Sequence, residues 1–137
     1  MLDAVKRLLL ASLCIFAVGC GGNSSNSNAS FRFAGTYEGT WVSTADETDH
    51  GTASWLIRSD GTFEGRDVDS TDGTIYMTGG NINASGNVQS VTLPHGGDPV
   101  NMNGTLQFNT QNQLTGVLVW QANPPISYRY TLTPVAP

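Results

Sequence analysis

Alternation of polar and apolar residues is the feature of this chain that most restricts its fold. From Phe31 to Thr133, short alternating runs recur roughly every 12 to 15 residues, each bounded by Gly, Asn, Asp or Pro. A period of two places successive side chains on opposite faces of a β-strand, whereas a helix needs a period of about 3.6. The pattern predicts eight strands, at residues 35–43, 51–58, 62–68, 74–80, 88–93, 100–108, 113–121 and 126–133.

Tight connections between these runs favour antiparallel hairpins within one all-β domain, residues 35–134. The predicted fold is an eight-stranded up-and-down antiparallel barrel, because sequential hairpins need no crossover and closure removes the exposed edge strands. A flattened two-sheet β-sandwich is the alternative. A chain of 137 residues has room for one such domain and not for two.

The same period assigns side chains to the two faces of the strands. We expect the apolar face to point inward and to occupy most of the barrel, with at most a shallow cup at one mouth. Its large residues include Trp41, Trp55, Ile75, Met77, Trp120 and Tyr128. Tyr76 falls on the other face, where it is the best exposed anchor for a partner, with Val117 and Val119 as companions.

Glycines on the apolar face predict how large residues pack across neighbouring strands. A three-residue loop at 59–61 with Gly61 left-handed sets Trp55 opposite Gly65, and the preceding hairpin can place Gly39 on the other side of the same indole. A loop at 110–112 predicts two further pairs, Leu106 with Gly116 and Gly104 with Leu118.

The N-terminal segment has the composition of a secretory signal. Lys6 and Arg7 precede an apolar run, residues 8–18, that is shorter than the roughly 20 residues needed to span a bilayer. The run ends in Ala17-Val18-Gly19-Cys20, which resembles the lipobox of bacterial lipoproteins. The resemblance implies a signal peptide at 1–19, acylation of Cys20 and anchoring to a membrane, with the outer membrane of the cell envelope favoured because Gly21 follows the cysteine. Residues 20–34 are then a lipidated cysteine and a flexible tether.

Charge argues against nucleic acid as a partner. The whole chain carries six basic and eleven acidic residues; without Lys6, Arg7 and Asp3, the part from Cys20 onward keeps four arginines, no lysine and ten acids. A protein that neutralises phosphates needs a basic face. The excess of acid instead favours a basic partner through electrostatic steering.

Two short motifs resemble those of lipocalins. Gly39-Thr40-Trp41 on the first strand is similar to the lipocalin G-x-W signature, and Ser59-Asp60-Gly61-Thr62-Phe63 is similar to a turn of bacterial lipocalin-like lipoproteins. The resemblance, to a lipocalin-like (calycin-type) small barrel, implies a noncatalytic binding module for a small apolar ligand, for which Trp41, Trp55, Trp120 and Tyr128 are the candidate contacts. The alternative is a protein-interaction module of the envelope, a scaffold or an inhibitor with a filled core.

Candidate catalytic and metal sites are sparse. The sequence has no nucleophile motif, and we expect its carboxylates to lie in turns or on the polar face, so the prediction is that the protein is not an enzyme and uses no cofactor. Asp67, Asp69 and Asp72 form a weak candidate calcium loop, because spaced carboxylates before a glycine suit an oxygen-seeking cation. His50 and His95, on two loops, are a weaker candidate for a transition metal.

Overall fold

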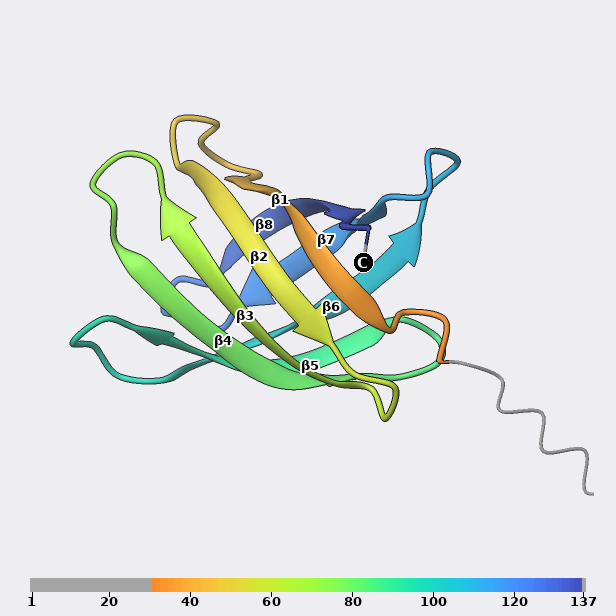
Figure 1. The fold of residues 1–137 in the computed structure, drawn as a ribbon. Helices are drawn as coiled ribbons and strands as arrows, with labels where there is room; N and C mark the ends of the chain where they lie inside the picture. Colours follow the sequence, from red (N-terminus) through yellow and green to blue (C-terminus); the bar gives the residue numbers. More distant parts are fainter. Residues whose placement is uncertain (1–30, 137) are drawn as a thin grey trace, which may run out of the picture.

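The computed structural model describes residues 31–136 and shows a closed eight-stranded antiparallel barrel (Figure 1). The strands follow in chain order and β1 pairs with β8, which confirms the predicted fold and excludes the two-sheet sandwich. The strands are β1 Gly35–Ser43, β2 His50–Ile57, β3 Thr62–Asp69, β4 Ile75–Ile82, β5 Asn87–Pro94, β6 Val100–Phe108, β7 Leu114–Trp120 and β8 Ile126–Pro134. The predicted signal peptide, Cys20 and most of the tether lie outside the described residues. Within the described part of the chain, no helix is long and apolar enough to span a membrane.

The hairpin registers confirm most of the predicted pairing between glycines and large residues. Trp55 lies opposite Gly65, and a Cβ added to that glycine would come within 2.5 Å of the indole. The two pairs predicted between β6 and β7, Leu106 with Gly116 and Gly104 with Leu118, are also observed. The prediction for Gly39 was wrong: the β1–β2 register sets Tyr37 opposite Trp55 and Gly39 opposite Ala53. On its two neighbouring strands, Trp55 is therefore opposite one glycine, Gly65, and one aromatic residue, Tyr37.

The predicted faces of β4 were also wrong. Tyr76 points into the barrel and Thr78 is buried, whereas Met77 is 50% exposed and Ile75 lines an outer groove. The cause is the register with β3, which pairs Met77 with the outward-facing Arg66 and Tyr76 with the inward-facing Asp67. Because side chains alternate with a period of two, this register turns every residue of the strand to the opposite side from the one predicted.

Two adjacent glycines of β4 offer a direct test of these faces. A Cβ on Gly80 would overlap the backbone of Gln89 and Ser90, whereas a Cβ on Gly79 would meet one atom at 3.6 Å. We expect Gly80→Ala to lower the free energy of unfolding by about 1–3 kcal/mol, because crowding of a packed core is destabilising. Gly79→Ala is expected to be neutral or slightly stabilising. Urea unfolding of both variants measures these free energies. If Gly79→Ala were the more destabilised of the two, the faces predicted from the sequence for β4 would be correct.

One end of the barrel is closed by the segment that precedes β1. Phe33 is fully buried, stacks on Phe108 with ring centroids 5.6 Å apart, and accepts a hydrogen bond at its carbonyl oxygen from the Tyr37 hydroxyl (2.9 Å). Aliphatic side chains such as Leu114 and Leu132 fill the space above it without exposure. The packed part of the chain thus begins before Gly35, the predicted start of the barrel domain.

Candidate binding site

A pocket lies at the opposite end of the barrel from Phe33, beneath the loops that connect β1 to β2, β3 to β4, β5 to β6 and β7 to β8. Figure 1 shows these four loops at one end of the ribbon. Its cavity volume is about 40 Å³. A single water molecule needs about 10–15 Å³ of such space, so the cavity has room for a few waters or for one compact chemical group. The pocket is lined by Trp41, Asp49, Asp67, Tyr76, Thr92, Met102, Trp120, Tyr128 and Tyr130.

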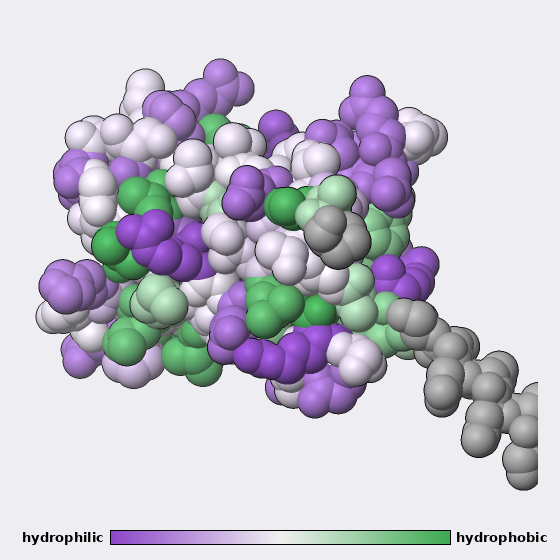
Figure 2. Space-filling view, in the orientation of Figure 1, coloured by the Kyte–Doolittle hydropathy of each residue, from purple (hydrophilic) through white to green (hydrophobic). Residues whose placement is uncertain are grey.

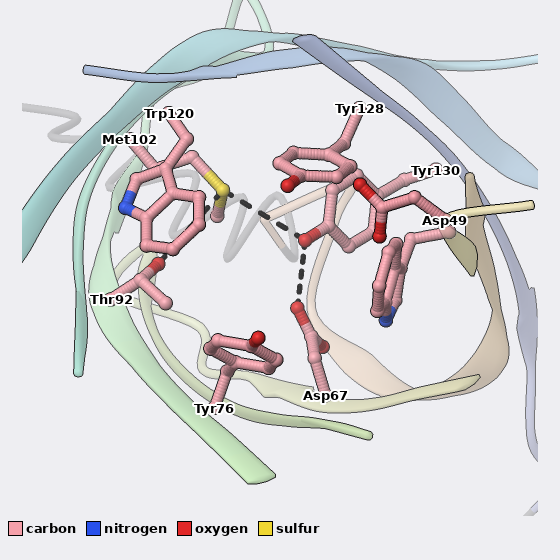
Figure 3. Close-up of a pocket in the computed structure, with 9 residues that line it drawn as sticks. Asp49, Asp67, Tyr76, Thr92, Met102, Trp120, Tyr128 and Tyr130 are labelled. Atoms are coloured by element: carbon pink, nitrogen blue, oxygen red, sulfur yellow. Dashed lines mark hydrogen bonds between the residues drawn. The ribbon is translucent and has the colours of Figure 1, made fainter. Parts of the chain in front are cut away.

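Aromatic rings form a continuous wall around this pocket. Trp41 meets Tyr128 edge to face at 5.3 Å, Tyr128 lies 6.3 Å from Trp120, and Trp120 meets Tyr76 edge to face at 6.0 Å, all measured between ring centroids. Figure 3 shows the rings of Tyr76, Trp120 and Tyr128 around a common space. Four strands supply these rings, because inward positions near the ends of β1, β4, β7 and β8 all meet at this mouth.

A buried carboxylate stands beside the aromatic wall. Asp67 is 3% exposed; one of its oxygens accepts a hydrogen bond from Trp55 Nε1 (2.8 Å) and the other from the Tyr130 hydroxyl (2.7 Å). Loss of water around the carboxylate raises its pKa to about 6, against the lowering effect of the two hydrogen bonds. Asp67 is therefore an exception to the expectation that the carboxylates lie mainly in turns or on the polar face.

Asp67 was placed in a turn and its burial was missed, although the alternation of β3 contains the signal for it. Gly65 was assigned to the inner face, and residue 67 has the same parity. An acidic residue is rarely placed in a core unless it has partners, and its partners, Trp55 and Tyr130, come from two other strands. Neither partner can be identified from local sequence.

A second carboxylate, Asp49, enters the pocket from the loop before β2. Burial raises its pKa, and the nearby charge of Asp69 adds to the effect, whereas the neighbouring Tyr128 hydroxyl opposes it. Burial likewise raises the pKa values of Tyr128, Tyr76 and Tyr130, so these hydroxyls keep their protons at neutral pH. The site therefore combines neutral aromatic side chains with two acidic ones.

Three of the four predicted ligand contacts converge on this pocket. Trp41, Trp120 and Tyr128 line it, and the indole N–H groups of both tryptophans are buried with no hydrogen-bond partner among the described residues. Trp55 lies deeper, 1% exposed and stacked on Phe63 at 4.7 Å, where it supports Asp67 and does not line the cavity. Tyr76, expected on the outside, is part of the lining.

The weak metal candidates do not come together. Asp67 points into the barrel, whereas the Asp72 side chain caps its own turn by accepting a hydrogen bond from the Thr74 backbone N–H (2.8 Å). Asp69 does the same for Thr71 (2.6 Å). Across residues 31–136, no group of three or more His, Cys, Asp or Glu side chains is arranged to hold a metal ion. This statement covers His50 and His95 as well as the three aspartates.

Comparisons with protein-family profiles, with curated proteins and with solved structures give no significant match. The structure itself gives the class of protein: a small closed β-barrel that is packed at one end and has an aromatic pocket at the other. Its strand order is consistent with a lipocalin-like fold.

Proposed function

We propose that this protein is a noncatalytic binding module of the bacterial cell envelope that takes up a small ligand at the open end of its barrel. The observation that carries the proposal is the pocket of about 40 Å³ walled by aromatic rings above a filled core. Concave sites with apolar walls and a few polar groups are typical of small-molecule binding. The packed half beneath the pocket leaves no space for a lipid-length chain, so the ligand is compact.

The lining chemistry favours binding over catalysis. The nine lining residues include no Ser, Cys, Lys or His, and both oxygens of Asp67 already accept hydrogen bonds from the protein. A general acid or base must reach the reacting group of its substrate, and a nucleophile needs an adjacent base. Among the described residues that line this pocket, none is arranged for such a step.

Native mass spectrometry of the full chain, expressed with its own N-terminal segment, tests the proposal. We expect a small bound mass in the wild-type protein and its loss in Trp120→Leu, which removes one face of the aromatic wall from a half-buried position. The matched control is Leu56→Ala on the outer face, where 39% of the residue is exposed. Only the apo mass in every preparation, or a ligand retained equally by Trp120→Leu, would argue against a binding role for this pocket.

Membrane anchoring through Cys20 is the second part of the proposal, and it is supported by the lipobox-like sequence before this residue. We expect Cys20→Ala to move the protein from the membrane fraction to the soluble fraction and to abolish labelling by a radioactive fatty acid. Both changes follow because alanine has no thiol to which an acyl chain could be attached. Two or more acyl chains are needed for stable anchoring. Cys14→Ala, within the predicted signal peptide, is the control. Unchanged membrane association of Cys20→Ala would refute the anchor.

An apolar stripe on the outside of the barrel favours the alternative function, a protein-interaction module. Met77, Val91 and Leu93 are 50%, 45% and 46% exposed, and β4–β5 pairing sets Met77 beside Leu93. Green side chains are visible over β4 and β5 in Figure 2. Val117 and Val119, the residues predicted to flank an exposed Tyr76, differ in exposure: Val117 is 41% exposed and Val119 is half-buried. Pull-down from envelope extracts at low and high salt separates the modes: an apolar contact survives salt, whereas a basic partner steered by acidic charge is lost.

A further inference from the structure

We propose that the ligand of the aromatic pocket is a small organic cation, such as a quaternary ammonium or amine head group, held by ring faces and carboxylates. The inference rests on the proposed binding function and adds the chemical class of the ligand. It combines three features of the described residues: the aromatic rings of the wall, the two carboxylates in the lining, and the distribution of charge around the mouth.

The aromatic wall supplies the first feature. A cation is attracted to the face of an aromatic ring by the ring quadrupole, and the attraction strengthens when water is excluded. Four successive rings, Trp41, Tyr128, Trp120 and Tyr76, border one cavity with neighbouring centroids 5.3 to 6.3 Å apart. Several rings around one compact space provide a cage for a group such as trimethylammonium, whose charge is spread over its methyl groups.

The carboxylates supply the second feature. Asp67 and Asp49 both line the cavity, and none of the nine lining residues is a lysine, arginine or histidine that would neutralise them. The Asp67 carboxylate is buried and is held by two neutral donors, Trp55 Nε1 and the Tyr130 hydroxyl. In Figure 3 this carboxylate lies close to Tyr76 at the side of the common space. A buried carboxylate without a positive partner favours a ligand that brings one.

Charge around the mouth supplies the third feature. The loops at the open end, residues 44–49, 70–74, 95–99 and 121–125, contain no lysine or arginine. Their acidic residues are Asp46, Glu47, Asp49, Asp72 and Asp98. Of the four arginines of the described chain, Arg32 and Arg58 lie at the closed end, and Arg66 and Arg129 are exposed on the outside of β3 and β8. This distribution draws cations toward the pocket and repels anions from it.

Choline and its neutral carbon isostere, 3,3-dimethyl-1-butanol, test the inference because they have the same shape and differ in charge. With calorimetric titration of the full chain, we expect choline to bind at least about tenfold more tightly than the isostere. We expect Asp67→Asn and Trp120→Leu each to weaken choline binding about tenfold or more. Asp60→Asn at the closed end is the matched control, because asparagine can keep the turn that Asp60 caps (2.9 Å to the Thr62 N–H), and its affinity should equal that of the wild type.

The outcomes separate this inference from the proposed function. Equal affinity for the two probes, or binding of the neutral probe alone, would overturn the choice of a cation and leave the binding module intact. Binding of neither probe would overturn it too, and the native mass spectrum then decides whether another ligand occupies the pocket. If Asp67→Asn does not fold, Trp120→Leu and the comparison of the two probes on the wild-type chain still decide the question.

Discussion

Phe33→Ala is expected to lower the free energy of unfolding by about 3–5 kcal/mol, the usual cost of deleting a buried phenylalanine side chain. Phe33 has no exposed surface, and its ring contacts Phe108, Phe31 and the guanidinium of Arg32, whose Cζ lies 4.2 Å from the ring centroid. The side chain closes the base of the barrel, where its ring is fully buried. Its loss therefore opens the lower core to water.

Phe31→Ala is the matched control, since Phe31 is half-buried and packs on the same cluster from outside. We expect it to cost about 1 kcal/mol, within the ordinary range for a partly exposed substitution. Urea unfolding followed by tryptophan fluorescence measures both variants. Equal, small effects would mean that residues 31–34 belong to the tether after all, as the sequence boundary at Gly35 implied.

The barrel itself was predictable because its two strongest signals agree. Alternation assigned the strands, and turn residues such as Gly61, which has φ of 84°, assigned the hairpin registers. Asn112, the last residue of the predicted loop at 110–112, is left-handed in the same way, with φ of 59°. Where the register and the alternation place the same side chain inside the barrel, as for Leu106 opposite Gly116, few other arrangements of the strands remain possible.

The site could be predicted only in part, because alternation weakens where the barrel opens. On β4, Met77 is more apolar than Tyr76, yet Tyr76 faces the pocket with its ring while Met77 faces solvent. On β5, buried positions hold Ser90 and Thr92, and exposed positions hold Val91 and Leu93. Polar groups face the cavity and apolar ones face outward in this region, so hydrophobicity alone assigns the faces in reverse. Departures from local rules of this kind are expected at functional sites.

The set of residues that lines the pocket could not be predicted from the sequence, for a different reason. The expectation of a filled core with a shallow cup agrees with the observed volume of about 40 Å³. The lining, however, comes from seven strands and one loop, and each residue contributes according to its height in the barrel. Height depends on the accumulated stagger of all hairpins around the closed sheet, which no single motif encodes.

Asp67→Asn is expected to remove a fall in stability that the wild-type protein shows as pH rises from about 4 to about 7. Burial raises the pKa of Asp67 in the native state to about 6 from 3.8. Between these values the native state keeps a proton that the unfolded chain has lost, so the free energy of unfolding decreases as pH rises through this interval. A difference of about two pKa units corresponds to roughly 3 kcal/mol. Asparagine has the same shape, can accept the Trp55 N–H bond and carries no charge.

Other carboxylates change stability in the opposite direction, so the measurement is the difference between two curves. Hydrogen bonds to Thr48, Thr62 and Thr74 lower the pKa values of Asp46, Asp60 and Asp72, and stability from these groups is lost as pH falls. They are common to both proteins and cancel in the difference. The titratable groups that share the pocket with Asp67, namely Tyr130, Tyr76, Tyr128 and Asp49, also remain in both.

Urea unfolding at pH 4, 5, 6 and 7 should therefore give similar stabilities for Asp67→Asn and wild type at pH 4 and a more stable Asp67→Asn at pH 7. Natural proteins often keep residues that lower stability where function needs them, and the function we propose for Asp67 is ligand binding. A bound cation should accordingly raise wild-type stability most at pH 7, where Asp67 is ionised, and should leave Asp67→Asn little changed. Parallel curves for the two proteins across the whole range would show that Asp67 ionises normally and would remove this reason for assigning it to the ligand.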